Sequence, residues 1–347
     1  MTTINAYGVQ SATDVVAPFN INRRAVGPTD IQIEILYCGV CHSDIHQAKN
    51  EWGGSIYPMV PGHEIVGTIT QVGADVKNFT VGQLAGVGCL VDSCQTCPSC
   101  MANQQQYCDE GGIGTYNAKD KQGNPTYGGY STQIVVDEKF TLHIAKSLPL
   151  QAVAPLLCAG ITTYSPLRHW KVGKGHKVAV VGLGGLGHMA VKFAVSFGAE
   201  VTVLSTSPSK QKDALALGAH HFSITNNADE MKSLAGSFYF ILNTISAQHD
   251  YNQYLGLLTV NGTMVVVGVP PQPTLVHAFS LIGKRRSLAG SLIGGIKETQ
   301  EMLDYCAQHN IVSDVEVINA NYINEAYTRM MKADVKYRFV IDIASIK

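Results

Sequence analysis

A glycine-rich turn near the middle of the chain constrains its fold more than any other feature. The apolar run Val178–Val181 leads directly into Gly182-Leu-Gly-Gly-Leu-Gly187, and a helix-like segment follows from His188 to Phe197. In such a unit the first glycine permits the tight turn, the second lets a pyrophosphate approach, and the third lets helix and strand pack closely. The helix N-terminus then faces the phosphates. The pattern predicts a dinucleotide site; the alternative is a glycine-rich turn in another kind of parallel sheet.

Apolar runs alternate with helix-like segments from Lys177 onward, which is typical of a doubly wound parallel sheet with right-handed crossovers. Residues 1–150 differ, because they contain short strands and glycine-rich turns, for example Ile31 to Tyr37, Ile65 to Thr70 and Tyr130 to Val136. The strands expected in the parallel sheet are Val178–Val181, Val201–Leu204, His221–Ser223, Phe238–Leu242, Met264–Gly268 and Ser287–Leu292.

This change of pattern divides the 347 residues, which are enough for two cores, at about residue 155. Residues 1–155 are expected to form one domain, with a cysteine-rich lobe over 89–112, and residues 156–293 the nucleotide-binding domain. Residues 294–347 contain a helix expected from about Lys297 to His309. This tail is too short for a domain, so we expect it to return to the first one.

The cysteine-rich lobe contains Cys94-Gln-Thr-Cys97-Pro-Ser-Cys100, and Cys108 follows after seven more residues. Four thiolates that converge in this way can surround a zinc ion tetrahedrally at about 2.3 Å, and they leave no open position for chemistry. The lobe therefore predicts a structural zinc. One alternative, disulfides, needs an oxidising compartment. The other, an iron–sulfur cluster, commonly has a shorter last gap and a proline where this chain has Asp109.

The overall charge excludes some classes of function. The net charge is −1 and the isoelectric point about 6.8, so the chain has no basic surplus for nucleic acid or anionic membranes. The N-terminus lacks the pattern of a signal peptide, and no apolar run reaches the roughly 18 residues of a membrane span. The nine unevenly clustered cysteines fit a reducing cytosol. We expect a soluble, cytoplasmic protein.

Further potential metal ligands stand in three segments: Gly39-Val-Cys41-His-Ser-Asp44, Pro61-Gly-His63-Glu64 and Cys158-Ala-Gly-Ile-Thr162. With the zinc lobe, the glycine turn and the C-terminal VKYRFVID, they resemble the zinc-dependent medium-chain alcohol dehydrogenases over essentially the whole chain. The nearest pattern is the cinnamyl-alcohol-dehydrogenase-like branch, which includes bacterial NADP-dependent aldehyde reductases. The resemblance implies an α/β fold, with a GroES-like β-barrel catalytic domain plus a Rossmann doubly wound parallel sheet domain.

The resemblance implies two zinc ions per chain. Two thiolates and an imidazole would hold the catalytic ion and leave one position for water, alcohol or carbonyl. Asp44 is expected to orient His63 through its other ring nitrogen. Cys38 is interpreted as a core residue, although Cys38-Gly-Val-Cys41 is itself a CxxC. The implied ligands are Cys41, His63 and Cys158 with Glu64 as an alternative ligand for the catalytic zinc, and Cys94, Cys97, Cys100 and Cys108 for the structural zinc.

Ser43 and His46 match the family's proton relay, in which the serine contacts the substrate oxygen and the histidine passes protons to solvent through the cofactor ribose. The alternatives are an N-cap serine and a surface histidine. The resemblance also places His42 and Arg338 near the pyrophosphate. The other contacts expected for the dinucleotide are Thr162, Gly182, Gly184, Gly185, Leu186, Gly187, Val267, Gly268 and Val269.

The cofactor is predicted to be NADP(H). An acidic residue about twenty positions beyond the glycines usually accepts hydrogen bonds from the NAD ribose. Here the strand instead ends in Ser205-Thr206-Ser207, and Lys210 follows. The hydroxyls can donate to a 2′-phosphate and the lysine supplies its countercharge. The alternative, an ordinary serine-rich turn, would still leave NAD without its acceptor.

These features predict reversible hydride transfer between the nicotinamide and a zinc-bound aldehyde or primary alcohol. Gly114 stands where plant cinnamyl alcohol dehydrogenases carry tryptophan, which predicts a roomier pocket and a broad aromatic and aliphatic range. The alternatives are a polyol dehydrogenase on the same scaffold and a non-catalytic NADP-binding protein. The strand near Ser287–Leu292 is expected at a sheet edge where family dimers join, so we expect a homodimer.

Overall fold

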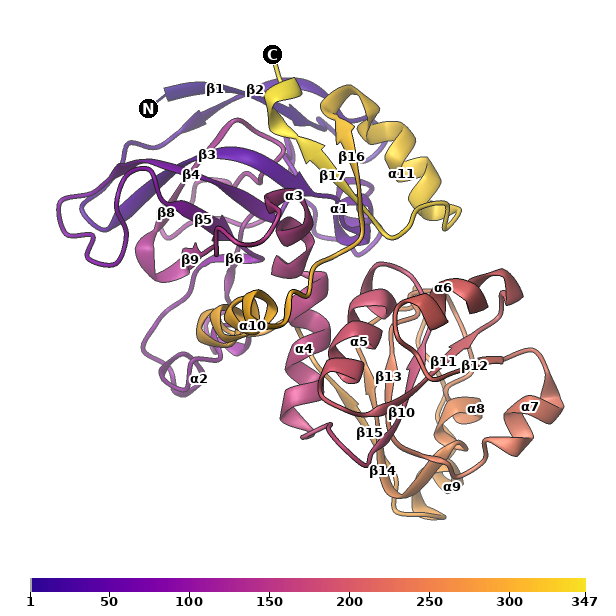
Figure 1. Ribbon diagram of the computed structural model, residues 1–347. Coiled ribbons are helices and arrows are strands. Elements are labelled where there is room, and N and C mark those ends of the chain that lie inside the picture. The colour runs from indigo at the N-terminus through magenta and orange to yellow at the C-terminus, as the bar shows by residue number, and fades with distance from the viewer. Residues whose placement is uncertain (1) are drawn as a thin grey trace. The chain divides into compact units, whose positions relative to one another are not determined.

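The computed structural model describes residues 2–347 (Figure 1). It divides into two compact units. The first is built from the residues up to Ile161 together with Gly294–Lys347, and the second from Thr162–Ile293. Each unit buries its own apolar core, and each is described by itself below.

The second unit is built on a six-stranded parallel sheet with the order β12-β11-β10-β13-β14-β15. The order reverses next to β10, and this is the switch point at which doubly wound sheets bind their ligands. The strands are β10 (Lys177–Val181), β11 (Glu200–Ser205), β12 (His221–Ile224), β13 (Phe238–Asn243), β14 (Leu258–Val266) and β15 (Ser287–Gly290).

The fifth strand differs from its prediction, since it begins at Leu258 and ends at Val266 instead of running from Met264 to Gly268. The backbone amides of Val267 and Gly268 both donate to the carbonyl of Asn243, which turns the chain away from the ladder. A Cβ on Gly268 would lie 2.3 Å from the Ile245 carbonyl oxygen, so only glycine permits this approach.

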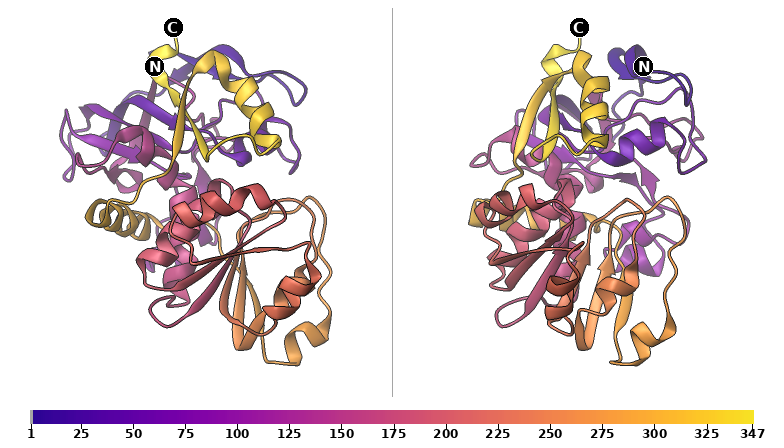
Figure 2. Two further views of the ribbon diagram at one scale, coloured as in Figure 1. Left: turned by 45° about the vertical axis from the view of Figure 1, so that its right-hand side comes forward. Right: turned by 90° about the vertical axis from the view of Figure 1, so that its right-hand side faces the viewer.

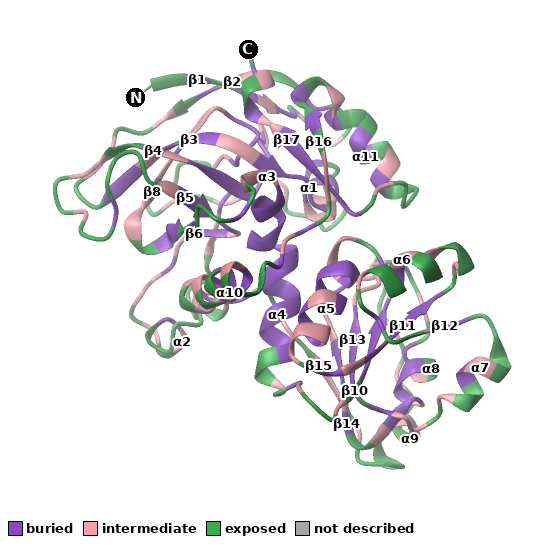
Figure 3. Cartoon of the chain, viewed as in Figure 1, coloured by how far each residue is buried: buried purple, intermediate pink, exposed green. Residues whose placement is uncertain are grey.

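Helices cover both faces of this sheet, as the right-handed rule for crossovers requires (Figures 1 and 2). The helices that lead to β11 and β12 lie on one face of the sheet. The helices that lead to β13, β14 and β15 lie on the other face. Figure 3 shows that β10 is buried between them, in keeping with its continuous apolar run. The helices are α4 (Ala159–His169), α5 (Gly185–Ser196), α6 (Gln211–Ala216), α7 (Ala228–Ser233), α8 (Tyr251–Leu255) and α9 (Ala278–Ile282).

The first unit is built around β3 (Asp30–Gly39), which pairs antiparallel with β4, β8 and β17. Ile31, Ile33 and Ile35 of β3 are buried while Glu34 is exposed, the alternation expected of a half-buried strand. The other strands are β1 (Thr2–Gly8), β2 (Ala17–Arg23), β4 (Ile65–Val72), β5 (Leu84–Val87), β6 (Leu90–Asp92), β7 (Ile113–Gly114), β8 (Gln133–Asp137), β9 (Leu142–His143), β16 (Val315–Asn319) and β17 (Arg338–Asp342).

The C-terminal segment belongs to this first unit, because β17 extends the sheet beside β3 with Val340 opposite Gly39. No helix within residues 2–347 combines the length and the apolar character needed to cross a membrane. The helices of this unit are α1 (His42–Ala48), α2 (Pro98–Met101), α3 (Leu150–Val153), α10 (Ile296–His309) and α11 (Ile323–Met331).

Candidate active site and metal centres

The four lobe cysteines converge in the first unit. Their sulfur atoms all lie within 4.8 Å of one another, and Cys94 Sγ is 3.9 Å from Cys100 Sγ. Sulfurs at about 2.3 Å from one tetrahedral ion would be about 3.8 Å apart, so this spacing fits zinc. The short helix α2 begins directly after Cys97, which serves as its N-cap.

Backbone amides prepare the lobe for thiolates. Cys94 Sγ accepts hydrogen bonds from the amides of Thr96 and Cys97, at 3.5 and 3.3 Å, and these bonds lower the pKa of Cys94 to about 6. The amide of Cys100 likewise donates to Cys97 Sγ at 3.4 Å. Since a thiolate is the form that binds zinc, these bonds favour the ligand state of Cys94, whereas burial raises the pKa of Cys100 to about 11.

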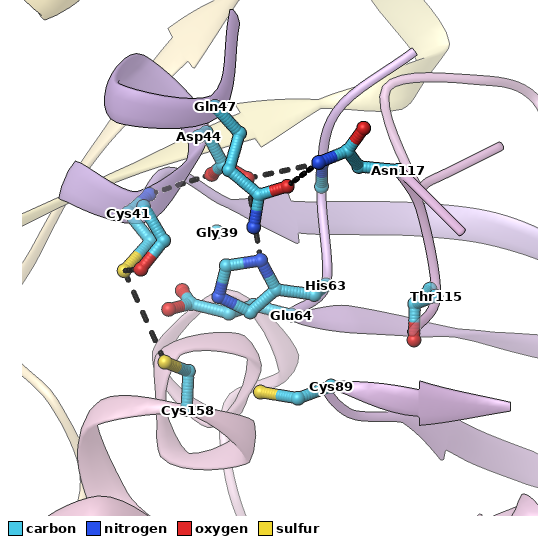
Figure 4. Close-up of polar contacts among 12 residues, drawn as sticks. Gly39, Cys41, Asp44, Gln47, His63, Glu64, Cys89, Thr115, Asn117 and Cys158 are labelled. Carbon is cyan, nitrogen blue, oxygen red and sulfur yellow. Dashed lines mark hydrogen bonds and ion pairs between the residues drawn. The ribbon is translucent and has the colours of Figure 1, made fainter. Parts of the chain in front are cut away.

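A second group of potential ligands, Cys41, His63, Glu64 and Cys158, is fully or almost fully buried, with its ligand atoms within 4.8 Å of one another (Figure 4). The sheet brings two of its members together. Strand β3 ends at Gly39 opposite the start of β4 at Ile65, so the residues that flank these ends meet. Cys158 comes from the turn before α4, and its Sγ lies 3.9 Å from Cys41 Sγ.

The donor set suits a catalytic zinc ion. Two thiols and one imidazole provide three soft or borderline ligands, and three protein ligands leave a position for substrate. The sulfur separation again fits one tetrahedral ion. His63 turns Nδ1 toward Asp44 Oδ1, 3.2 Å away, so Nε2 is the ring nitrogen that remains for a metal.

Asp44 holds the site together. It is fully buried on the first turn of α1, and its Oδ2 accepts the backbone amide of Cys41 at 2.8 Å, which caps the helix. Its Oδ1 accepts the amide of Gly62 at 3.2 Å. The carboxylate therefore fixes the segments that carry both Cys41 and His63.

Glu64 pairs with Arg338, an arrangement that the sequence did not reveal. Both side chains are buried, and the guanidinium donates to Glu64 Oε1. Burial raises the pKa of Glu64, and the charge of Arg338 opposes that shift. The other oxygen, Oε2, has no hydrogen-bond partner among the described residues. Glu64 thus has one carboxylate oxygen without a hydrogen-bond partner, and that oxygen lies against Gly39.

The two cysteines near the site have different environments. Cys38 is fully buried at the end of β3 and lies outside the four-residue group. Cys89 is partly exposed and directs its sulfur toward Cys158 (Figure 4). A Cβ on Gly114 would lie 3.0 Å from the Tyr116 carbonyl oxygen and 3.9 Å from that of Cys89, so Gly114 lies near the Cys89 backbone.

The predicted relay residues lie on α1. Ser43 Oγ is 3.7 Å from Cys41 Sγ, which places its hydroxyl beside a candidate ligand. His46 stands one turn further, with Nδ1 2.5 Å from Glu51 Oε2 and its ring stacked on Trp52. Within residues 2–347 Ser43 and His46 share no direct hydrogen bond. A bridging hydroxyl, such as that of a cofactor ribose, would be required to connect them.

The glycine turn of the second unit has the expected local geometry. Gly182 has a φ of +90°, and a Cβ on Gly187 would lie 2.1 Å from the Gly182 carbonyl oxygen. A Cβ on Gly184 would meet nothing within 4 Å, so the backbone there is open to a pyrophosphate. Gly185 and Leu186 begin α5, with Gly184 as its N-cap. Val267, Gly268 and Val269 follow β14, and Thr162 is buried in α4.

The end of β11 has the composition that a 2′-phosphate requires. Ser205 is buried and its Oγ accepts the amide of Ser207 at 3.2 Å, whereas Thr206 is exposed. Lys210 Nζ donates to the Leu183 carbonyl at 2.9 Å, which ties the lysine to the glycine turn. Glu200 stands at the opposite end of β11, so no carboxylate on this strand reaches that site.

His42 and Arg338 belong to the first unit, unlike the other predicted cofactor contacts. His42 begins α1, and burial lowers its pKa. Arg338 is engaged with Glu64, as described above. The sequence missed Glu51, Arg338 as a partner of Glu64, and the position of Cys89. Only Glu51, an acid five residues after a relay histidine, left a local signal.

Comparisons with known proteins show the family of the chain. The alcohol dehydrogenase GroES-like domain matches residues 27–146, and the zinc-binding dehydrogenase domain matches residues 185–308. An NADP-dependent alcohol dehydrogenase C of Mycolicibacterium smegmatis is 56% identical over 348 residues, covering 100% of both chains. The aldehyde reductase YahK of Escherichia coli is 55% identical over 343 residues, with 98% of each covered.

Among solved structures, cinnamyl alcohol dehydrogenase from Helicobacter pylori in complex with NADP(H) superposes with a TM-score of 0.94. It is 45% identical, and 99% of each chain is covered. The two domain matches and the full-length relatives agree on one assignment. The chain belongs to the zinc-binding medium-chain alcohol dehydrogenases, in their cinnamyl-alcohol-dehydrogenase-like branch.

Proposed function

We propose that this enzyme reduces aldehydes with NADPH, and oxidises primary alcohols in reverse, at a centre formed by Cys41, His63 and Cys158. The observation that carries this proposal is the convergence of these three side chains. The imidazole of His63 is one of them, and the buried carboxylate of Asp44 orients it. Relatives of more than half identity are named as NADP-dependent alcohol dehydrogenase and aldehyde reductase. A non-catalytic protein would have no need of an open three-ligand site.

Reduction of an aldehyde adds a hydride from NADPH to the carbonyl carbon and a proton to the oxygen. Zinc, when bound, supplies a Lewis acid at that oxygen. Ser43 then donates the proton, since its hydroxyl lies beside Cys41. His46 would resupply that proton, and Glu51 orients the imidazole from its exposed side. Asp44 keeps His63 in the tautomer that offers Nε2 to the metal.

NADP(H) selectivity rests on the end of β11. Ser205, Thr206 and Ser207 would donate to the 2′-phosphate and Lys210 would provide the positive charge, and no carboxylate stands at that end of β11 to repel it. Gly182, Gly184 and Gly187 would hold the pyrophosphate. We assign His42 and Arg338 to the same cofactor. Because cells generally keep NADP reduced, aldehyde reduction is the physiological direction.

The substrate pocket is broad. Gly114 contributes no side chain beside Cys89, where a tryptophan would add a large wall. Benzaldehyde-like and medium aliphatic aldehydes are therefore accepted without commitment to phenylpropenyl groups. One or two missing apolar contacts change selectivity by a factor of 10 to 200 at most, on the order of 1 to 3 kcal/mol.

The enzyme works as a homodimer in the cytosol. Strand β15 is the outermost strand of its sheet, and an open edge invites pairing with a second copy. Exposed apolar side chains follow it or stand on the preceding segment, namely Leu275, Phe279, Ile282 and Leu292. The nine cysteines are all free thiols, which suits a reducing compartment.

The experiment that tests this function is a panel of aldehydes, primary alcohols and polyols, assayed with NADPH, NADH and their oxidised forms. We expect aldehydes with NADPH to give the highest kcat/KM. Preferred oxidation of polyols would support the polyol dehydrogenase instead. The absence of turnover with every pair, in protein that retains two zinc ions, would contradict the proposal.

A further inference from the structure

Three buried side chains from distant parts of the chain form a hydrogen-bonded line that ends at the candidate catalytic centre. The hydroxyl of Tyr327 donates to the hydroxyl of Tyr130 at 3.4 Å, and Tyr130 donates to Asp44 Oδ2 at 3.1 Å. Tyr130 and Asp44 are 0% exposed and Tyr327 is 8% exposed. The line therefore lies inside the first unit and is almost fully shielded from bulk water.

Asp44 is the junction between this line and the metal site. Its Oδ2 accepts from Tyr130 and from the Cys41 amide, and its Oδ1 accepts from the Gly62 amide and faces His63 Nδ1. Both oxygens thus have two partners each. Removal of the tyrosine bond would leave Oδ2 with the Cys41 amide alone and would let the carboxylate rotate away from His63.

Packing alone does not explain why both buried side chains are tyrosine, because burial of each hydroxyl costs free energy. A phenol buried without a partner is unfavourable, whereas phenylalanine would fill the same space with no polar atom to satisfy. Both positions nevertheless have a hydroxyl, and each hydroxyl donates in the direction of the buried Asp44 carboxylate. Linked hydroxyls also polarise one another, so the outer one strengthens the inner one.

We propose that Tyr130, supported by Tyr327, is a positioning residue that fixes Asp44 and so sets how tightly His63 and its neighbours hold zinc. The inference rests on the metal role proposed for His63. Tyr327 comes from α11 in the returning C-terminal segment, 197 residues from Tyr130. That segment therefore supports the metal site as well as completing the sheet.

The test compares Tyr130→Phe and Tyr327→Phe in the full-length chain. Zinc affinity is measured by competition with a chromogenic chelator, and the two sites are distinguished because Cys158→Ala identifies the catalytic ion. Partners of metal-bound histidine are worth about 10- to 100-fold in affinity. We expect about tenfold weaker binding at the catalytic site in Tyr130→Phe and about threefold in Tyr327→Phe, with the structural zinc retained.

Tyr57→Phe is the matched control. The Tyr57 hydroxyl donates to the Ala48 carbonyl at 2.8 Å, at the end of the same helix that carries Asp44, but it does not touch Asp44. Its loss should leave catalytic zinc affinity unchanged. Cobalt substitution adds a spectroscopic readout, since the ligand-field bands should shift in Tyr130→Phe and not in Tyr57→Phe.

A double-mutant cycle separates this role from general packing. In an Asp44→Asn background the further change Tyr130→Phe should have no additional effect on zinc affinity. Zinc affinity of Tyr130→Phe within twofold of the native value, or an equal loss in Tyr57→Phe, would overturn the inference. If Tyr130→Phe does not fold, Tyr327→Phe decides by the same criteria. These zinc measurements need no substrate, so they stand or fall separately from the proposed reaction.

Discussion

His46 Nδ1 lies 2.5 Å from the carboxylate of Glu51, and the ring of Trp52 stacks on the imidazole of His46. Glu51 therefore holds the ring with Nε2 directed away from the carboxylate. A proton relay needs such an orientation because the ring must receive and release protons at different nitrogens.

Glu51→Gln should lower kcat about five- to tenfold and leave the KM for NADPH within twofold, since general acid–base steps contribute about 10²–10⁴ and Glu51 only orients the base. Glu51→Asp keeps the charge and should recover part of the loss. The solvent isotope effect on kcat should rise in Glu51→Gln. An unchanged kcat in that variant would remove Glu51 from the relay.

The two zinc sites should separate by mutation. Cys100→Ala should lower the melting temperature, because four-thiolate sites contribute folding free energy. Cys158→Ala should abolish turnover while circular dichroism shows the fold largely retained. Equal loss of folding in both variants would refute this division of roles.

Zinc binding at the catalytic site should strengthen as pH rises. Hydrogen bonds with Cys41 and Cys89, and then burial, raise the pKa of Cys158. Its thiol is therefore protonated near neutral pH and must lose that proton to bind zinc, so each proton released makes affinity rise about tenfold per pH unit. Chelator competition at pH 6 and pH 8 measures this slope. A flat profile would show that Cys158 does not bind the metal.

Ser205→Asp should move preference toward NADH. The new carboxylate would stand at the end of β11, where it repels a 2′-phosphate and can accept from a ribose. We expect KM for NADPH to rise at least about tenfold, with a smaller change for NADH. Ser205→Ala removes the hydroxyl without adding charge and should show a weaker effect. A wild-type enzyme that uses NADH as well as NADPH would contradict this interpretation of the strand.

Local patterns in the sequence predicted most of the fold and brought out the four lobe cysteines as candidate ligands. The glycine turn after Val181 and the cysteine spacing from Cys94 to Cys108 each depend on a few adjacent residues, so short-range chemistry determines them. The predicted end of β14 at Gly268 was wrong, because the strand ends at Val266. The amides of the next two residues donate to the carbonyl of Asn243 on the neighbouring strand. An apolar run cannot show where a neighbouring strand interrupts a ladder.

The contacts that the sequence could not show join residues far apart in the chain. Arg338 meets Glu64 across 274 positions, and Tyr327 meets Tyr130 across 197. Each residue alone is an ordinary buried or surface side chain. Only the return of β17 and α11 to the first unit brings them to the metal site.

The most direct test of the central claim is the rate of NADPH oxidation with benzaldehyde before zinc removal, after it, and after zinc is restored. The account predicts turnover in the native protein, its loss when a chelator removes the catalytic ion, and its recovery on addition of Zn²⁺, with Cys158→Ala inactive throughout. Undiminished reduction in protein shown by elemental analysis to have lost the catalytic zinc would contradict it.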